Sequence, residues 1–316
     1  MTQRRTLLAL PFLAFAARGA AAQAPPLVGA SFSILGDLVR QVAGDRVTLR
    51  VTAGPGVDAH HFEPRPSDAL ALRGAALLVR NGLGFDPWFD RLARAAAEGP
   101  PVPVVTATDG ITPRGMEAHH DHDHGGAGRR TQHSVGPRRV PDPHAWQDVA
   151  LAQHYVRNIT EGLARVQPGA AEAHRAAAAA CLQRLQALDA WIRAQIATVP
   201  TERRKVLTTH DAFGYFGAAY GVTFLAAQGV SAEAEPSAAA IARLIRQVRA
   251  ENITAVFLEG QGNQSALERL AREAGVAPRG RLHADALSPA DGPAPSYEAM
   301  MRHNVTLMVN GMRGAA

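Results

Sequence analysis

The sequence predicts an α/β protein of two lobes, each with a parallel sheet flanked by helices, bridged by one long rigid α-helix. Short β-branched runs alternate with helical patterns before residue 110 and again after residue 200. Such alternation is typical of βα units and parallel sheets. A stretch rich in Ala, Leu, Gln and Arg separates the two regions. The chain has 316 residues, of which 47% are hydrophobic, and this is enough for two domains.

The first region should hold four strands and three helices. We expect strands at 26–34, 46–54, 76–82 and 102–110, with helices at 35–44, 67–75 and 86–99. From Ile111 to Pro143 the chain is rich in Gly, Pro, His and Arg without a hydrophobic period. This pattern predicts a long loop, and loops of that length are usually functional or disordered. A helix at 146–166 completes an N-terminal lobe spanning 25–166.

The region 167–199 should form the linking helix. After Pro168 and Gly169 it has no further glycine or proline until Pro200, and its residues are strong helix formers. A helix of ~30 residues is a rod ~45 Å long, long enough to cross a whole molecule. Cys181, the single cysteine, lies in this stretch. We expect it to be a buried helix residue rather than a reactive thiol.

The second α/β region, 200–316, repeats the alternation. Strands are expected at 205–211, 222–230, 253–260 and 279–287, and helices at 213–221, 236–252, 263–275 and 296–311.

The first 24 residues have the features of a cleaved export signal. Arg4 and Arg5 precede an apolar run from Leu7 to Ala17, and small residues stand at Ala22 and Ala24. The alternative is a membrane anchor, but the run is shorter than the roughly 20 residues that a spanning helix needs. We therefore expect an exported, periplasmic protein, and the arginine pair leaves twin-arginine export open beside the general route. No cysteine stands near the cleavage site, which argues against a lipid anchor.

The charge of the chain does not indicate nucleic-acid binding. The formal net charge is +5, and three arginines of the export signal supply part of it, leaving +2 for the rest. This is too small for an electrostatic footprint on nucleic acid.

Metal-ligand residue types follow several of the expected strands. His60 or His61 follows the second strand, His210 follows the first strand of the second region, and Asp285 follows the last. His144 precedes a helix. Taken singly, each histidine could be an ordinary hydrogen-bonded residue, and Asp285 could cap a turn. Together, two in each lobe, they predict a metal site, because ligands bind at the carboxyl ends of parallel strands.

Six motifs in order along the chain resemble the metal-binding substrate-binding proteins of bacterial ABC importers, the zinc and manganese group. They are "DAHHFEPRPSD", "DPHAWQD", "HDAFGYFGAAYG", "SAEAEPSAAAIARLI", "VFLEGQGNQSALERLARE" and "HADAL". The resemblance covers about residues 26–311. It implies the fold predicted above, a metal clamped between the lobes, a permease in the inner membrane as partner and a protein that is not an enzyme. A monomer is expected, and a periplasmic zinc chaperone is a further candidate partner.

The resemblance implies four ligands: His60, His144, His210 and Asp285. It leaves His61 in a variable slot. At the third ligand position, His210, this chain resembles the zinc members of the family, whereas manganese members tend to have a carboxylate there. Three imidazoles and one carboxylate also suit zinc chemically. Zn²⁺ is therefore the expected cargo, with manganese as the alternative. Gly260 departs from the family, which often has proline or another residue there.

A second group of histidines lies in the long loop 111–143: His119, His120, His122, His124 and His133. A loop so rich in Gly, Arg and Pro cannot hold a single geometry, so we expect auxiliary zinc binding with loose stoichiometry. It resembles the His-rich loop of zinc members. The alternative is an insertion whose histidines have no role.

Two other classes of function compete with import. A zinc hydrolase would keep an open metal position and a general base, for which Glu63 or Glu259 would be the candidates. A fourth ligand at Asp285 would close that position, the H-E-x-x-H pattern is absent from the sequence, and Glu63 and Glu259 are expected to support ligands instead. An adhesin or zinc buffer that works without a permease is the third class. Co-purification with a permease would separate it from an importer.

Overall fold

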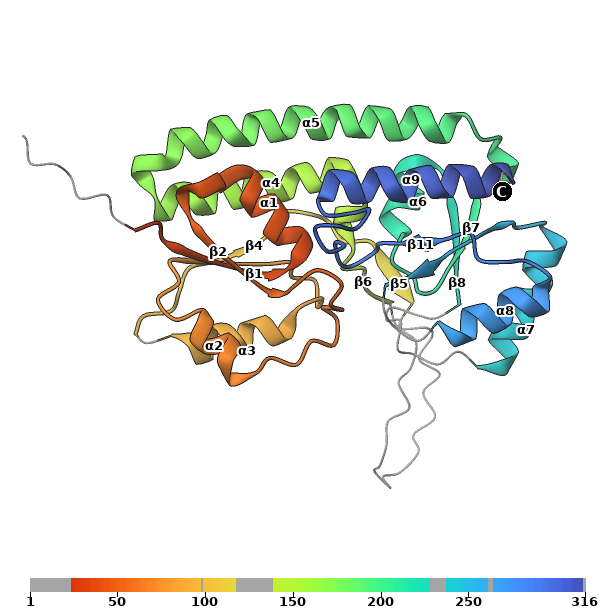
Figure 1. The fold of residues 1–316 in the computed structure, drawn as a ribbon, viewed down its shortest axis with the longest axis horizontal. Coiled ribbons are helices and arrows are strands. Elements are labelled where there is room, and N and C mark those ends of the chain that lie inside the picture. Colours follow the sequence, from red (N-terminus) through yellow and green to blue (C-terminus); the bar gives the residue numbers. More distant parts are fainter. Residues whose placement is uncertain (1–23, 98, 118–138, 228–236, 261–263, 315–316) are drawn as a thin grey trace, which may run out of the picture.

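Two α/β lobes lie side by side under one long helix (Figure 1). The computed structural model describes residues 24–97, 99–117, 139–227, 237–260 and 264–314. The expected fold class is confirmed. Within the described residues, every helix is too short or too polar to cross a membrane. Residues 1–23 of the predicted export signal and all five loop histidines lie outside the described residues.

The N-terminal lobe contains a parallel sheet with the strand order β2-β1-β3-β4. Its strands are β1 (Leu27–Phe32), β2 (Thr48–Ala53), β3 (Leu77–Arg80) and β4 (Val104–Thr106). Its helices are α1 (Ser33–Ala43), α2 (Pro66–Ala71), α3 (Pro87–Ala96) and α4 (Val149–Val166). Helices α1 and α4 lie on the side of α5, whereas α2 and α3 cover the opposite face (Figure 1). All three strand-to-strand pairings are parallel, so the carboxyl ends of the four strands meet at one edge.

The C-terminal lobe has a smaller parallel sheet, β8-β7-β9, and a second strand pair, β10-β11. Its strands are β7 (Lys205–Thr208), β8 (Thr223–Ala226), β9 (Ala255–Val256), β10 (Leu258–Glu259) and β11 (Arg281–Leu282). Its helices are α6 (Gly214–Tyr220), α7 (Ala238–Ala250), α8 (Ser265–Ala274) and α9 (Tyr297–Arg313).

The single strand expected at 253–260 is divided at Phe257. The N–H of Phe257 donates to Leu207 O at 2.9 Å, and the next N–H, of Leu258, donates to Gly280 O at 3.1 Å. The chain therefore changes partner from β7 to β11 within one residue, and the Phe257 ring is fully buried. The expected strand at 279–287 is also shorter, because the chain leaves the sheet after Leu282 and carries Asp285 in an irregular connection.

The prediction that 111–143 has no regular structure is wrong at both ends of that loop. Strand β5 (Gly115–Glu117) pairs antiparallel with β6 (Arg139–Pro141), and Glu117 lies opposite Arg139. These short strands lack the apolar alternation that sequence reasoning uses, so no pattern indicated them. The pairing brings together the two ends of the His-rich segment 118–138.

Helix α5 (Ala171–Ala197) is the expected linking helix, and a short 3₁₀ turn at Pro168–Ala170 precedes it. Its buried residues recur every three or four positions, which gives one narrow face directed inward. They are His174, Ala178, Cys181, Leu185, Leu188, Ile192 and Ile196. This face contacts α1 and α4 of the first lobe and α9 and α6 of the second. Burial also raises the pKa of the Cys181 thiol to about 11, as expected of a structural cysteine.

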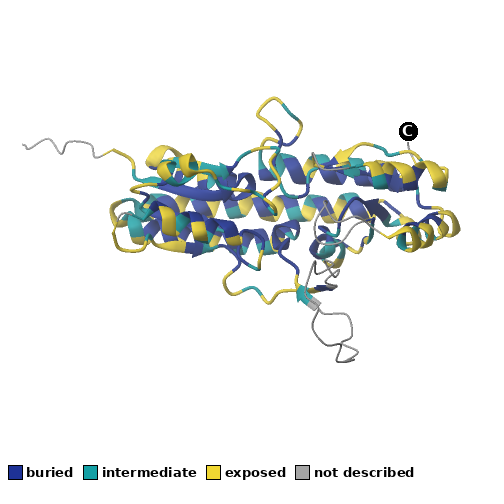
Figure 2. Cartoon of the chain, turned by 90° about the horizontal axis from the view of Figure 1, so that it is seen from below, coloured by how far each residue is buried: buried dark blue, intermediate teal, exposed yellow. Residues whose placement is uncertain are grey.

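One hydrophobic core runs through both lobes. It joins Val79 of β3, Leu188 of α5 and Phe257 into a single cluster of buried side chains. A separate smaller core lies between the C-terminal sheet and helices α7 and α8. Figure 2 shows buried residues along the whole length of the molecule and exposed ones mainly at its rim. A continuous core makes independent motion of the lobes costly, because opening them would expose packed apolar surface.

The shared core predicts that both lobes unfold together. Leu188→Ala removes a fully buried side chain from α5 and should lower the free energy of unfolding by about 3 kcal/mol. Gln186→Ala, on the exposed face of the same helix, should change it by less than about 0.5 kcal/mol. Denaturant unfolding followed by circular dichroism and tryptophan fluorescence measures both. Two transitions, only one of them shifted by Leu188→Ala, would contradict a shared core.

Candidate metal centre

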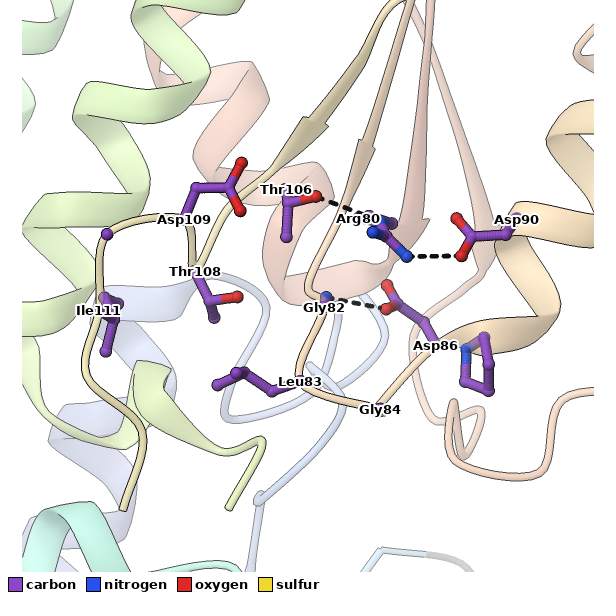
Figure 3. A pocket seen from close by; sticks show the side chains of 12 residues that line it. Arg80, Gly82, Leu83, Gly84, Asp86, Asp90, Thr106, Thr108, Asp109 and Ile111 are labelled. Atoms are coloured by element: carbon purple, nitrogen blue, oxygen red, sulfur yellow. Dashed lines mark hydrogen bonds and ion pairs between the residues drawn. The ribbon is translucent and has the colours of Figure 1, made fainter. Parts of the chain in front are cut away.

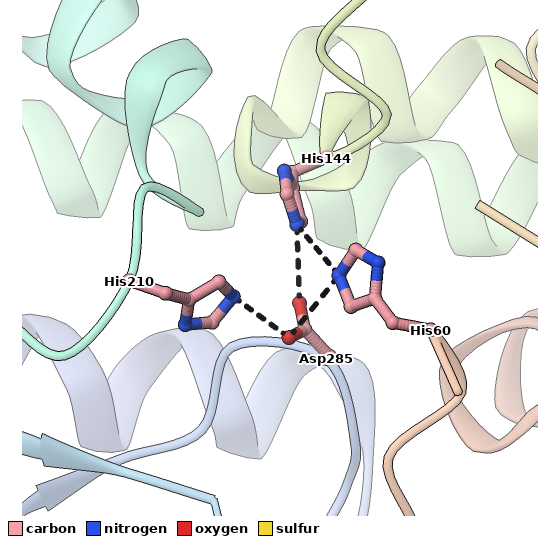
Figure 4. Close-up of side chains that lie close together, drawn as sticks. All are labelled: His60, His144, His210 and Asp285. Carbon is pink, nitrogen blue, oxygen red and sulfur yellow. Dashed lines mark hydrogen bonds and ion pairs between the residues drawn. The ribbon is translucent and has the colours of Figure 1, made fainter. Parts of the chain in front are cut away.

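Four side chains from distant parts of the chain meet between the lobes (Figure 4). His60 comes from the loop after β2, His144 from the turn before α4, His210 from the end of β7, and Asp285 from the connection after β11. Their candidate ligand atoms all lie within 4.8 Å of one another. Three of the four follow the carboxyl ends of parallel strands, which is where α/β sheets bind ligands.

The distances suit a small cation at the centre of the group. His60 Nε2 lies 3.1 Å from His144 Nε2 and 3.7 Å from Asp285 Oδ2. Asp285 also has Oδ1 at 3.6 Å from His144 Nε2 and Oδ2 at 2.9 Å from His210 Nε2. In a tetrahedral zinc site with bonds of about 2.0 Å, ligand atoms stand about 3.3 Å apart. An octahedral site gives similar neighbour distances, so the donor types carry more information about the metal than the spacing does.

Two carboxylates outside the cluster orient two of the imidazoles. Asp142 Oδ1 lies 2.8 Å from His144 Nδ1 and also accepts the backbone N–H of His144 at 3.0 Å. Glu259 Oε2 lies 2.7 Å from His210 Nδ1. In both histidines Nδ1 therefore faces a carboxylate, which leaves Nε2 directed into the cluster. Such carboxylate–histidine pairs fix the ring orientation and make the imidazole a better metal donor.

Glu259 is itself held by the strand end that carries His210. Its Oε1 accepts the N–H of Thr209 at 2.6 Å and the N–H of His210 at 3.2 Å. Glu259 is only 2% exposed, so it needs these donors to be stable as a buried carboxylate. The His210 ring and its backbone are thus anchored to one side chain.

Tyr215 on α6 ties the Asp142 segment to the second lobe. Its hydroxyl donates to Asp142 O at 3.2 Å and accepts the N–H of Arg114 at 3.0 Å. Gly214 leaves room for this contact, because a Cβ there would lie 2.8 Å from Asp142 Oδ2 and would displace that carboxylate. The segment that carries His144 is therefore fixed against the helix that follows His210.

His60 is held differently, by packing and backbone contacts. Its ring meets the edge of Phe85, with centroids 4.5 Å apart. Its N–H donates to Asp58 Oδ1 at 2.8 Å, and the carbonyl of Ala59 accepts from Trp88 Nε1 at 2.7 Å. No carboxylate contact to its Nδ1 is found among the described residues, so this ring has less electrostatic support than the other two.

Burial and neighbouring charges favour a neutral His60, a protonated His210 and an ionised Asp285, so a bound metal would displace the proton of His210. Burial lowers the pKa of His60 to about 3; the other two imidazoles act in the same direction, whereas Asp285 opposes the shift. The ring therefore stays neutral and free to donate a lone pair. Burial disfavours a charge on His210, but Glu259 and Asp285 outweigh it and raise the pKa of His210. Burial would raise the pKa of Asp285, yet His210 holds it below the usual range. Asp285 is therefore an anion, and its buried Oδ1 has no hydrogen-bond donor among the described residues.

The structure brings together the four expected residues and separates the alternatives from them. His61 is exposed, whereas His60 points into the cluster. Glu63 is exposed and lies outside the cluster. Of the two glutamates expected to support a ligand, only Glu259 contacts one of the four residues, His210. Gly260 adopts φ +49°, a backbone conformation that proline cannot adopt.

Sequence reasoning missed the role of Asp142, although it stands two residues before His144 in "DPH". An aspartate that accepts the N–H two residues later is an ordinary turn element, and this spacing could have indicated it. The contacts of Trp146 and Gln147 described below depend on the tertiary fold, and no sequence pattern indicates them.

A separate pocket of about 430 Å³ lies in the N-terminal lobe beside the ends of β3 and β4 (Figure 3). None of the four clustered side chains lines it. Its main charged groups are already paired: Arg80 contacts Asp90 at 2.6 Å, and Asp86 accepts the N–H groups of Asn81 and Gly82. These contacts fix the backbone turn around Leu83, whose φ is +53°. The charged groups that line the pocket are thus explained by contacts that stabilise the local fold.

Comparison with known proteins agrees with this geometry. Residues 28–311 match the family described as zinc-uptake complex component A, periplasmic (ZnuA). The manganese-binding lipoprotein MntA of Halalkalibacterium halodurans is 32% identical over 282 residues, 89% of this chain and 87% of that protein. The zinc-binding protein TroA of Treponema pallidum is 30% identical over 302 residues, 94% of this chain and 92% of that protein.

Solved structures show the same architecture. The periplasmic zinc-binding protein TroA from Treponema pallidum superposes with a TM-score of 0.78 at 28% identity, covering 92% of this chain and 99% of that one. A Mn-bound periplasmic metal-binding protein from Candidatus Liberibacter asiaticus gives a TM-score of 0.75 at 25% identity, covering 91% and 99%. The chain therefore belongs to the ZnuA family of metal-binding substrate-binding proteins that serve ABC importers.

Proposed function

We propose that this protein captures Zn²⁺ outside the cytoplasm and delivers it to an ABC permease of the inner membrane. The family consists of metal-binding transport proteins rather than enzymes, and its members work with a permease and an ATPase. The proposed ligands are His60, His144, His210 and Asp285. The observation that carries the choice of zinc is the donor set, three imidazole nitrogens and one carboxylate oxygen within 4.8 Å of one another. Four such donors complete a tetrahedral zinc shell and leave no position for a catalytic water.

The proposal also includes the export of the protein, its location and its partners. Residues 1–24 act as a cleaved signal, and the mature protein works in the periplasm as a monomer. Relatives are named as lipoproteins or periplasmic proteins. A periplasmic zinc chaperone is a further proposed partner.

Manganese is the second candidate cargo, because MntA, a relative with 32% identity, is named as manganese-binding. His210 favours zinc, since a carboxylate in its place would supply the oxygen donor that manganese prefers. Most nitrogen and oxygen sites bind Zn²⁺ more tightly than Mn²⁺, so displacement of Mn²⁺ by Zn²⁺ is expected but does not decide between them. The metal content of the exported protein decides, and it should be zinc. Equal affinities, or purification of the exported protein with bound manganese, would contradict the zinc proposal.

Asp285→Asn tests the ligand set with little change in shape. Loss of the carboxylate charge should weaken zinc binding by more than about 100-fold, since even residues that only support a ligand cost 10–100-fold. Zinc should correspondingly lose most of its ability to raise the melting temperature. Asp291→Asn, an exposed position in the same connection, is the matched control. Calorimetric titration of protein lacking residues 1–24 measures both, and equal affinities would exclude Asp285 as a ligand.

Glu259→Gln tests the support of His210. The amide preserves the size of the side chain but loses the charge that orients Nδ1, so zinc affinity should fall by about 10–100-fold. Glu268→Gln, exposed on α8, should have no effect. An unchanged affinity in Glu259→Gln, with the fold intact by circular dichroism, would show that the contact at 2.7 Å is not needed for binding.

The five loop histidines are proposed as auxiliary zinc donors that are separate from the tight site. Because Glu117 and Arg139 are paired opposite each other, residues 118–138 can be replaced by Asn-Gly, which closes an antiparallel pair with a two-residue turn. The shortened protein should keep one tight zinc site and lose the weaker binding events in calorimetry. Loss of the tight site would place the main ligands in the loop.

A further inference from the structure

Two neighbouring side chains from one lobe donate to a single carbonyl in the other. Trp146 Nε1 donates to Ala284 O at 2.9 Å, and Gln147 Nε2 donates to the same oxygen at 2.9 Å. Trp146 and Gln147 are fully buried, and Ala284 is 3% exposed. Trp146 and Gln147 stand two and three residues after His144, and Ala284 directly precedes Asp285. The contact therefore joins the segments that carry two of the proposed ligands.

The same connection is attached to the N-terminal lobe at further points. Leu287 N–H donates to Ser33 Oγ at 3.0 Å, and Leu287 O accepts from the N–H of Gly56 at 2.9 Å. Tyr297, at the start of α9, donates from its hydroxyl to Trp146 O at 2.6 Å. The segment 284–297 thus belongs to the second lobe in sequence but takes its position from the first.

Gln147 is an unexpected residue for this buried site. Its Oε1 is buried and has no hydrogen-bond partner among the described residues. An unsatisfied buried acceptor costs free energy comparable with that of a lost hydrogen bond, and an apolar side chain of the same shape would avoid this cost. The contact that Gln147 makes and an apolar residue could not make is the N–H donation to Ala284 O.

We propose that Gln147, together with Trp146, is a positioning residue that holds Asp285 at ligand distance from His144 before any metal binds. This inference rests on the proposed metal-binding function. Without this contact, the irregular connection after β11 could relax, and Asp285 Oδ1 would no longer be fixed 3.6 Å from His144 Nε2. Metal would then have to draw the carboxylate into place, which reduces affinity and loosens the coordination geometry.

Gln147→Met tests this role, because methionine has a similar length and lacks the N–H. The variant should fold and, without metal, be as stable as the parent protein or more so, since the unsatisfied acceptor is removed as well. Zinc affinity should fall by about 10–100-fold, and the intense visible absorption of tetrahedral Co²⁺ bound at the site should weaken as its geometry loosens. Thr160→Val, which removes one buried hydrogen bond within α4, is the control for a purely structural loss and should leave affinity and spectrum unchanged.

Trp146→Phe removes the second donor and keeps a six-membered aromatic ring in its place, and it serves as an independent variant if Gln147→Met folds poorly. A loss of affinity and a changed Co²⁺ spectrum in either folded variant support the positioning role. Parental affinity and spectrum in both would overturn it, and if Asp285→Asn still lost tight binding, the proposed function would survive that result. If the parent protein itself bound neither Zn²⁺ nor Co²⁺, both proposals would be overturned.

Discussion

The rest of the structure depends on the contacts that the buried carboxylate of Asp285 makes with its neighbours. Asp285 contacts three imidazoles from three different segments, and its side chain is only 13% exposed. An anion in that position is stable only if positive or donor groups surround it from both lobes. The strand ends, the turn before α4 and the connection after β11 must therefore all be placed to within a few tenths of an ångström.

Several layers of contact meet this requirement. Asp142 and Glu259 orient two imidazoles, Tyr215 ties the Asp142 segment to α6, and Gln147 fixes the backbone next to Asp285. Helix α5 and the continuous core then limit the relative motion of the lobes. This arrangement favours capture by a preformed site over large closure of the lobes. Under this account, metal entry and exit require only small movements of the segments that carry the ligands.

Much of this was predictable from sequence, for physical reasons that differ between elements. Helix α5 was clear because its residues include no glycine or proline and are mostly strong helix formers, and the positions of His210 and Asp285 followed from the rule that ligands gather at strand ends. The β5–β6 pair was missed because its strands are three residues long. The break at Phe257 depends on competition between two neighbouring strands, which a local pattern cannot contain. The contacts of Gln147 required the packed fold.

X-ray absorption spectroscopy at the zinc edge, on the mature protein loaded with one equivalent of Zn²⁺, tests the central claim most directly. A closed site made by His60, His144, His210 and Asp285 predicts four nitrogen or oxygen neighbours at about 2.0–2.1 Å, with the multiple-scattering signal of about three imidazoles. Six light-atom neighbours, or a shell made only of imidazoles, would contradict it.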